Sequence, residues 1–447
     1  MKKVLVAGAA LLIAGSMVSA ASAEVNLSGD ARARYIGNSD RIRTYTPLPN
    51  GTWQENKSGY QDEFDSRIRV KFDAKSPGGA FMKARLRFDD YDYWDGQGWS
   101  ASRDVVRHNK TGGVWTDYAL IGVPIGPTVL SAGRMEASFS KFFSWDGRAT
   151  RVKLDWKFDN FRLIPLIDVM DESVNATDDW NDNDFMGYGL VGSAKINDDW
   201  SVKAYARYHD DQREYDSVSV TIPVSVSSAD QQFYTERDTP PSVTLEEIRP
   251  GHYDRSGFLG SIDAQGKVAM VGLHGGIAYK EAEVLSANPN ADDGWGWYLE
   301  GSLDMGAFSP ALVIGGTYDG YQTDPDFGFI MIGADEPITV VTTIGAGNSD
   351  SIFAALTSTY AMSDQLKFAG NLVYYDIDVN STEATPDVRG LVDAWEISGS
   401  ATYVLVDGAD LTYKIGYLSP SYDGRVNSAG ISDDGYFGNY LRLSVKF

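Results

Sequence analysis

The sequence of 447 residues contains no cysteine. This absence excludes disulfide bonds, thiolate metal sites, covalently attached c-type haem and a cysteine nucleophile. The chain also lacks HExxH, GxSxG and phosphate-loop motifs, which are the local patterns of several enzyme classes. We therefore expect neither an enzyme nor a bound cofactor. Histidine is scarce as well, and no two of the four lie at metal-ligand spacing: His108, His209, His252 and His274.

Basic residues are outnumbered, since 39 Lys and Arg stand against 62 Asp and Glu and give a formal net charge of −23. Such an acidic chain has no general attraction for nucleic acid or for anionic lipid. The stretch 171–184 carries six carboxylates and no base. It could coordinate Ca²⁺ through oxygen ligands, although such a loop is more often a solvated outer surface. We expect no nucleic-acid partner and at most a weak Ca²⁺ site at acidic outer loops.

Long apolar runs are missing except for one, from Val4 to about Ala20. Two lysines precede this run and the small-residue sequence ASAEV follows it, a pattern typical of a secretory signal peptide. We expect residues 1–23 to be removed during Sec export, which leaves residues 24–447 as one exported domain. No later stretch is apolar for long enough to cross a bilayer as a helix.

Alternation of apolar and polar residues recurs along residues 24–447. The last residues, YLRLSVKF, place Leu441, Leu443, Val445 and Phe447 on one face, with polar residues between them. A period of two indicates a strand with one apolar and one wet face. About 18 such segments can be recognised, and no interval has a persuasive amphipathic helical pattern.

The connections between these segments alternate between short and long. Eight turns of four or five residues, such as SPGG at 76–79, separate nine longer polar loops. This arrangement predicts an all-β fold, a transmembrane antiparallel β-barrel of about 18 strands with short periplasmic turns and long extracellular loops. Closure requires the last strand to pair with the first, because lipid tolerates no open sheet edge. Stretches 211–254 and 329–345 also alternate, so either could be a plug, an extra hairpin or a further strand pair; 16 or 20 strands stay possible.

Several segments resemble Gram-negative outer-membrane porins. These are the first strand directly behind the signal peptide, the hairpin ALIGVPIGPTVLSAGRM and the carboxy-terminal phenylalanine strand. Porins typically read GL…G…LGR before the loop that folds into the pore, and Gly122, Gly133 and Arg134 match this pattern. General porins more often have 16 strands and a longer constricting loop.

The resemblance implies a location in the outer membrane, in contact with its lipid and lipopolysaccharide, and a homotrimer. It also implies a water-filled channel for passive diffusion of small hydrophilic solutes and ions. The terminal Phe447 resembles the signal that the barrel assembly machinery reads.

The wet faces of the strands predict a basic ladder inside the pore. With a hairpin loop at 77–79, Arg69 faces Arg87 and Lys71 faces Arg85, although like charges directly opposite cost stability. Such residues are either merely solvated or form one side of a charged constriction that selects solutes. The predicted pore-lining bases are Arg32, Arg34, Arg67, Arg69, Lys71, Lys83, Arg85, Arg87, Arg134, Arg151, Lys153, Lys203 and Arg207.

The opposite side of the constriction is expected on the loop after Arg134, whose candidate acids are Glu136 and Asp146. A substrate-selective channel is the alternative to a general diffusion pore. The ladder would suit anions such as phosphate, whereas the loop aromatics Phe139, Phe142, Phe143 and Trp145 would suit sugars. An outer-membrane lipase would instead need a serine–histidine pair on the lipid face, for which His274 is the candidate.

Overall fold

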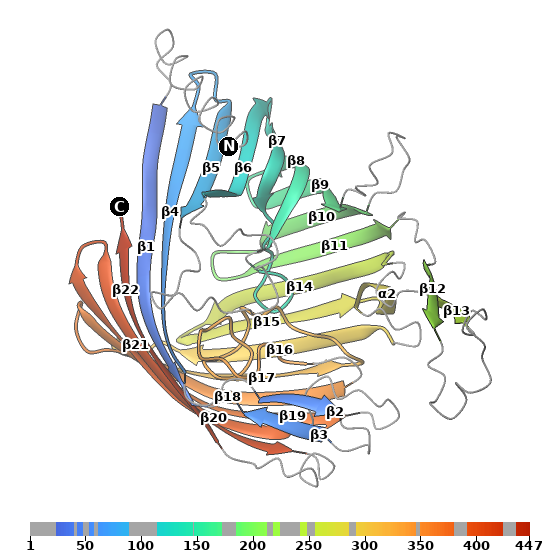
Figure 1. Cartoon of the computed structure of the whole chain (residues 1–447). Helices are drawn as coiled ribbons and strands as arrows, with labels where there is room; N and C mark the ends of the chain where they lie inside the picture. The colour runs from blue at the N-terminus through green and yellow to red at the C-terminus, as the bar shows by residue number, and fades with distance from the viewer. Residues whose placement is uncertain are drawn as a thin grey trace.

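The closed sheet predicted from the alternation is present in the computed structural model (Figure 1). Eighteen antiparallel strands form one sheet that returns on itself, which confirms the predicted strand number and topology. The structure describes residues 24–39, 43–47, 53–57, 61–88, 114–145, 147–171, 185–211, 218–223, 242–247, 255–285, 292–345, 349–379, 391–422 and 435–447. The expected signal peptide, residues 1–23, lies outside these ranges.

The barrel strands follow one another around the wall in chain order, each antiparallel to the next. They are β1 (Glu24–Asn38), β4 (Gln61–Lys75), β5 (Phe81–Phe88), β6 (Trp115–Ile125), β7 (Thr128–Glu136), β8 (Arg148–Lys157), β9 (Phe161–Asp171), β10 (Phe185–Lys195), β11 (Ser201–Asp211), β14 (Gly257–Val268), β15 (Val271–Lys280), β16 (Gly294–Leu303), β17 (Phe308–Tyr318), β18 (Ser349–Ala361), β19 (Leu366–Val379), β20 (Leu391–Val406), β21 (Ala409–Tyr422) and β22 (Tyr436–Lys446).

Two small hairpins and one helical turn complete the described structure. Strand β2 (Arg43–Pro47) pairs with β3 (Trp53–Lys57), and β12 (Val218–Pro223) pairs with β13 (Ser242–Glu247). The second hairpin is one of the outcomes predicted for 211–254, and it adds no strand to the barrel. Helix α2 spans Ala282–Leu285. Within the described ranges no helix has the length and apolar character needed to cross a bilayer.

Closure is made by the two ends of the chain. Strand β1 pairs with β22 on one side and with β4 on the other, and Ala33 lies opposite Leu443 in the first of these ladders. The last residue takes part as well, because Gly29 N donates to Phe447 O at 2.8 Å and Phe447 N donates to Gly29 O at 3.1 Å. The predicted pairing of the first and last strands is therefore confirmed.

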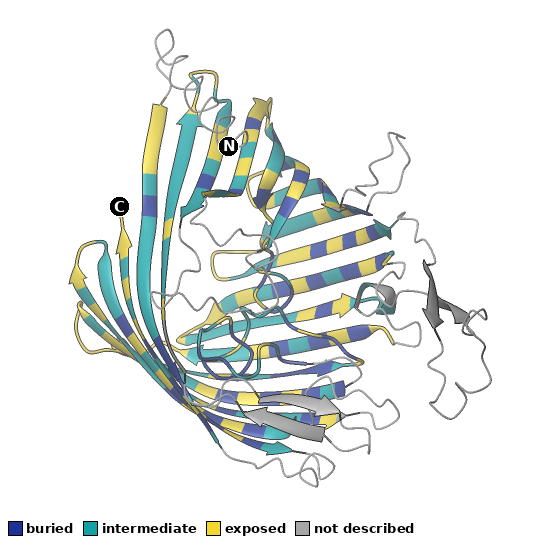
Figure 2. Cartoon of the chain, in the orientation of Figure 1, coloured by how far each residue is buried: buried dark blue, intermediate teal, exposed yellow. Residues whose placement is uncertain are grey.

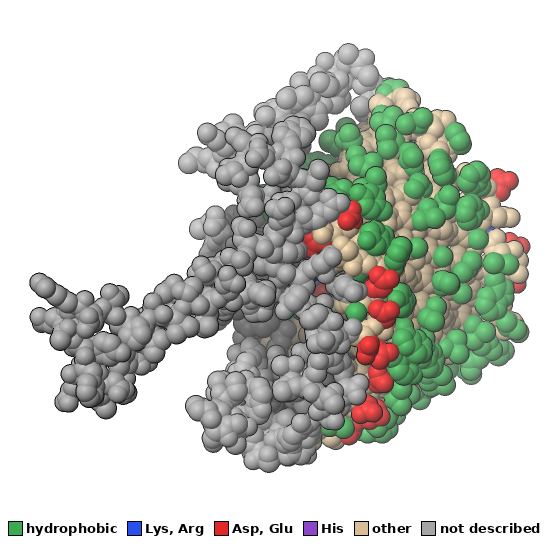
Figure 3. Space-filling model, turned by 90° about the vertical axis from the view of Figure 1, so that its right-hand side faces the viewer, with side chains coloured by type: hydrophobic (Ala, Val, Ile, Leu, Met, Phe, Trp, Pro, Cys, Tyr) green, Lys and Arg blue, Asp and Glu red, His purple; other side chains and the backbone are tan. Residues whose placement is uncertain are grey.

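The strand faces are divided as the alternation predicts. On β22, Leu441, Leu443 and Val445 point outward and are 41, 41 and 39% exposed. Tyr440, on the inward face of the same strand, is 1% exposed. Buried and exposed residues alternate along β11 and β14 (Figure 2). Figure 3 shows apolar side chains spread over the outer wall, with a row of acidic side chains along one edge. An apolar surface of this extent suits lipid rather than water.

Aromatic pairs lie on the outer face near the long-loop ends of the strands. Each pair joins two neighbouring strands, at ring-centroid distances between 4.4 and 5.1 Å. Amphipathic rings at this height are the girdle that flanks the apolar band of membrane barrels. The pairs are Tyr35 with Phe64, Tyr208 with Phe258, Trp295 with Tyr318, and Tyr374 with Trp395.

The close contact at the seam predicts that Gly29 cannot carry a side chain. A Cβ at Gly29 would lie 2.4 Å from Arg69 O and 2.6 Å from the Phe447 ring. We expect Gly29→Val to lower the free energy of unfolding by about 1–3 kcal/mol through overpacking, measured by urea unfolding of the folded barrel in micelles. Ala31→Val, on the same outward face of β1, is the control and should change the midpoint less. Equal midpoints for both variants would contradict this account of the seam.

Candidate functional site

The inner faces of β4 and β5 have the register that the hairpin predicted. Arg69 lies opposite Arg87, and Lys71 lies opposite Arg85. Like charges at such positions repel unless carboxylates are placed among them. The structure supplies these carboxylates from neighbouring strands, and together with the arginines they form what we call the basic wall, on β1, β4–β6, β8, β9 and β11.

Two aspartates of the basic wall are each shared by two arginines. Asp30 on β1 and Asp65 on β4 point into the lumen between the guanidinium groups. Arg69 Nε lies 2.9 Å from Asp30 and Arg34 Nε lies 2.7 Å from Asp65, while Arg67 and Arg32 complete the two clusters at 3.9 Å.

A third aspartate, Asp117 on β6, is shared by three arginines. Arg85 donates to its carboxylate, Arg148 Nε lies 3.0 Å from Oδ1, and Arg87 Nη2 lies 3.3 Å from the same oxygen. Glu136 lies 3.6 Å from Arg85. Glu136 ends β7, two strands from β5 in the barrel wall, and its role as an acid opposite the basic ladder stays a prediction.

The fourth aspartate, Asp168 on β9, is 0% exposed and binds Arg151 at 2.6 Å and Arg207 at 3.1 Å. Buried ionic groups of this kind are strongly coupled, because few water molecules screen them. Across the four clusters, nine arginines share four aspartates. Glu136 is a fifth carboxylate beside these arginines.

The remaining predicted bases lie outside the four clusters: Lys71, Lys83, Lys153 and Lys203 share the inward face of the arginines, whereas the ladder places Arg134 on the face of the exposed Ile121 and Val152. Arg134 Nε donates to Asp117 O at 3.1 Å. Lys83 lies 3.8 Å from Asp73, in a pair that is about half exposed. Lys203 is exposed, and it lines a cavity of about 840 Å³ at the short-turn end of the barrel together with His274 and Glu300. Lys71 and Lys153 are half-buried.

The loop after β7, residues 137–145 and 147, leaves the basic wall and lies inside the barrel; we call it the aromatic loop. Phe142 is 1% exposed and stands 5.0 Å from the ring of Tyr298 on β16. Phe139 and Phe143 stand 5.5 and 5.4 Å from Tyr205 on β11. The partner rings are inward residues of strands four and seven places away from β7 around the barrel. Asp146, the second predicted acid, lies outside the described residues.

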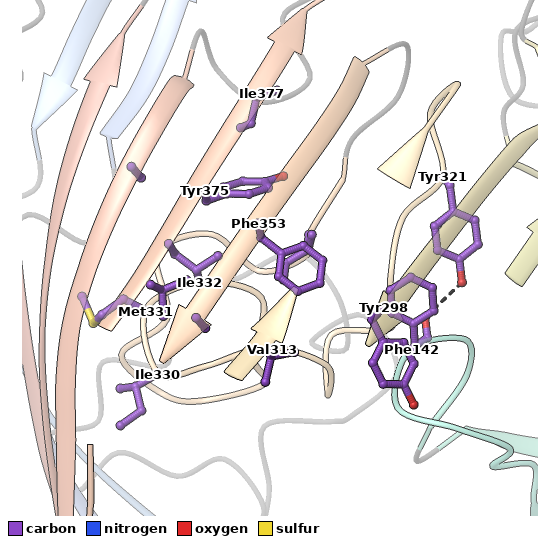
Figure 4. Close-up of a cluster of buried hydrophobic side chains, with 14 of the residues drawn as sticks. Phe142, Tyr298, Val313, Tyr321, Ile330, Met331, Ile332, Phe353, Tyr375 and Ile377 are labelled. Carbon is purple, nitrogen blue, oxygen red and sulfur yellow. Dashed lines mark hydrogen bonds between the residues drawn. The ribbon is translucent and has the colours of Figure 1, made fainter. Parts of the chain in front are cut away.

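A second inward segment, residues 319–345 between β17 and β18, is called the lining loop. Its 329–345 part alternates like a strand in sequence, yet it has only one isolated bridge, between Ile332 and Val341. Instead, its apolar side chains pack on the inner faces of β18–β22 and form a core there (Figure 4). The buried apolar side chains of the loop are Tyr321, Ile330, Met331, Ile332, Ala334, Ile338 and Ile344.

The lining loop also brings an acid to the basic wall. Glu336 pairs with Lys414 on β21, accepts a hydrogen bond of 3.0 Å from Tyr440 OH on β22, and interacts electrostatically with Arg34. Sequence reasoning missed this residue, because it sought the opposing acids on the loop after Arg134. The four shared aspartates were visible on the wet faces of the strands, but nothing local indicated which arginines they would join.

The two inward loops bind each other. Tyr321 OH donates to Phe142 O at 3.0 Å, and Trp145 N donates to Asp324 Oδ2 at 2.8 Å. Lys280 Nζ lies 4.8 Å from the ring centroid of Tyr321 and contacts the aromatic loop as well, at 5.6 Å from the Phe143 ring. Burial raises the pKa of Asp324 above its usual value, although two backbone N–H groups bind it.

His274 does not lie on the lipid face. Its Nε2 stands 3.1 Å from Asp263 Oδ2 and 2.9 Å from Tyr298 OH, among inward residues of β14–β16. The serine–histidine arrangement of a lipid-facing lipase is therefore not built around this residue. In the described part of the chain, no group of three or more His, Asp or Glu residues could hold a metal ion.

The fold and the site define a class of protein: a closed membrane-type barrel whose charged lumen is narrowed by two inward loops. No family model matches the sequence, and no curated protein matches it either. Solved structures do match. A BenF-like porin from Pseudomonas fluorescens Pf-5 has a TM-score of 0.56 at 11% identity, over 95% of this chain and 98% of that chain.

Two proteins of Pseudomonas aeruginosa are similar in the same way. OpdQ has a TM-score of 0.55 at 11% identity, over 95% of this chain and 98% of its own. The outer membrane protein OprD has a TM-score of 0.52 at 11% identity, over 94% and 93%. At such low identity the likeness establishes the fold alone, and that fold is the one of outer-membrane porins.

The Asp117 cluster predicts a large cost for neutralising its carboxylate. We expect Asp117→Asn to lower the free energy of unfolding by about 3–5 kcal/mol, because three arginines lose the counter-charge that they share in a buried site. Urea unfolding of the folded barrel measures this change. Asp73→Asn is the control: it breaks the half-exposed pair with Lys83 and should cost about 1 kcal/mol or less. A loss for Asp117→Asn no larger than for Asp73→Asn would show that the cluster is screened by water.

Proposed function

We propose that this chain is an outer-membrane channel of a Gram-negative bacterium that passes small hydrophilic solutes and favours anions. The observation that carries the proposal is the row of nine guanidinium groups that the described strands gather around four aspartates of the inner wall. A narrow water-filled passage with low-dielectric walls focuses the field of its fixed charges. A row of guanidinium groups along one side of such a passage therefore attracts anions.

Guanidinium groups also favour particular anions. Their planar fork matches the two oxygens of a carboxylate or phosphate, whereas a lysine offers a point charge. Arginine supplies all nine bases of the four shared-aspartate clusters. We therefore propose organic carboxylates or phosphates as the solute class, with chloride as the simplest ion that tests the field.

The inward loops support a selective channel over a wide diffusion pore. The aromatic loop reaches strands far from its own, and the lining loop covers β18–β22 from inside, so both occupy space that an open pore leaves to water. A selective anion channel thus fits better than general passive diffusion, which was the first expectation from sequence.

A sugar channel is less well supported. Ring faces that guide a sugar must be open to the lumen, but Phe139, Phe142 and Phe143 are only 8, 1 and 3% exposed. Of the four loop aromatics singled out in the sequence, Trp145 alone is accessible, at 40%. The rings hold the loop in place and leave little aromatic surface for a solute.

Location and assembly belong to the same proposal. The apolar outer wall and the likeness to the outer membrane protein OprD support insertion in outer-membrane lipid, with lipopolysaccharide around the rim. Export by the peptide at 1–23 and recognition of Phe447 by the barrel assembly machinery would precede insertion. The homotrimer is proposed from the resemblance to porins.

The purified protein, reconstituted into a planar bilayer under a potassium chloride gradient, tests the proposal. We expect small current steps whose reversal potential lies on the chloride side. Phosphate or a dicarboxylate added to one compartment should reduce the current, and glucose should not. Large current steps without ion selectivity would instead support a general diffusion pore. Absence of current from folded protein would overturn the channel proposal itself.

Charge reversal on the basic wall should change ion selectivity. We expect Arg85→Glu with Arg87→Glu to move the reversal potential towards the cation side, because two positive charges become negative beside Asp117. The milder pair Arg85→Gln with Arg87→Gln should move it less, in the same direction. The glutamine double variant allows the measurement if the glutamate double variant does not fold.

The matched control places the same charge change at the short turns. Lys157→Glu with Lys195→Glu alters two exposed lysines at the mouth of the barrel, where water and salt screen them. These changes should leave the reversal potential close to its original value. A shift as large as that of the Arg85 and Arg87 variants would show that the basic wall does not control selectivity.

A further inference from the structure

A carboxylate lies buried beneath the lining loop. Glu396 is on the inner face of β20, between Val373 of β19 and Leu418 of β21 in the ladders, and it is 0% exposed. A carboxylate is costly to bury unless hydrogen-bond donors satisfy its charge. One donor is Ser398 Oγ of the same strand, and two come from the lining loop: Ile330 N lies 3.0 Å from Oε1 and Ile332 N lies 2.9 Å from Oε2.

These two hydrogen bonds satisfy backbone N–H groups of the lining loop. Buried backbone N–H groups require acceptors, and residues 329–332 are not paired in a strand. Some groups are satisfied within the loop, as Val340 N donates to Met331 O at 3.1 Å. The amides on either side of Met331 donate to Glu396 instead. One side chain of the wall therefore sets the direction of this backbone segment.

The wall is shaped to receive the loop at neighbouring positions. A Cβ at Gly416 on β21 would lie 2.5 Å from Met331 Sδ, and a Cβ at Gly438 on β22 would lie 2.8 Å from Ile338 Cβ. Any larger residue at these inward positions would push the loop away. The loop side chains thus fill spaces that two glycines leave open.

Two further side chains of the barrel wall bind the lining loop at positions distant from Glu396. Tyr375 OH on β19 accepts a hydrogen bond of 2.8 Å from Gly345 N, near the end of the loop. On the other side, Tyr440 OH donates to Glu336 Oε2 at 3.0 Å. Attachment points are therefore spread over β19, β20 and β22.

We propose that Glu396 is a positioning residue that fixes the lining loop to β18–β22, which makes this loop a permanent second wall of the passage and not a movable gate. Glu396 does not meet the solute; it acts by placing the loop that carries Glu336 towards the basic wall. The inference rests on the proposed function only for its effect on ion passage. The position of the loop can be tested whether or not the barrel conducts.

Thiol accessibility tests the position, because the chain has no cysteine of its own. In Ala334→Cys the thiol replaces a side chain of the lining loop that is 8% exposed. We expect it to react with a charged methanethiosulfonate reagent at least about tenfold more slowly than Gln265→Cys, an exposed position on the inner face of β14. Adding Glu396→Ala should accelerate the Ala334→Cys reaction about tenfold or more and leave Gln265→Cys unchanged.

Glu396→Gln is the conservative variant, since its amide oxygen can still accept from one of the two loop N–H groups, although its NH2 group cannot accept from the other. It should return part of the protection that Glu396→Ala loses. In the bilayer, Glu396→Ala should enlarge the current steps and weaken selectivity, and Glu396→Gln should lie between that variant and the parent protein. Electrophoretic mobility of unheated samples reports folding in each case, since a folded barrel migrates differently from the heated chain.

Three results would overturn the inference. The first is rapid labelling of Ala334→Cys in the parent background, which would mean a mobile loop. The second is unchanged labelling in folded Glu396→Ala. If Glu396→Ala does not fold, Tyr375→Phe with Tyr440→Phe removes two attachment points at nearly constant volume, and unchanged labelling in that variant is the third. Faster labelling with no change of current would keep the loop assignment and count against the channel.

Discussion

The rest of the structure depends on one constraint, that every backbone group of a wall facing lipid must be paired within the wall. The ladder between β1 and β22 meets it, and it runs to the last residue through Gly29 and Phe447. Closure removes both sheet edges and fixes the register around the ring. With the register fixed, each side chain is assigned to the outside or to the lumen, and the chemistry of the lumen follows from that assignment.

The lumen meets a second requirement, since inward charges must be hydrated or paired. Nine arginines meet it by sharing aspartates. Asp30, Asp65 and Asp168 each serve two guanidinium groups and Asp117 serves three. Shared pairing holds the arginines in place along one side of the lumen, so the same contacts order these side chains and gather their charges.

Strand number, closure and the opposition of Arg69 to Arg87 could be predicted from sequence, because a period of two depends only on local residues. The same reasoning left the segment 329–345 open between a plug, an extra hairpin and a further strand pair. Its alternation is that of a strand, but its amides bond to Glu396 and to its own turns, since the barrel is closed without it. The path of the loop after β7 could not be predicted for a related reason: the direction in which a loop crosses a lumen is decided by distant partners such as Tyr298.

The inward loops differ from ordinary surface loops in what holds them. Their apolar side chains pack on the inner wall, and they are also joined to each other through Tyr321, Asp324 and Lys280. A displacement of one loop therefore disturbs the contacts of the other, so the two behave as one inner body. That body packs on β11 and β16–β22, whereas eight of the nine clustered arginines lie on β1, β4, β5 and β8. In the channel proposed above, the narrowing by the loops and the charge of the arginines therefore act on the same lumen.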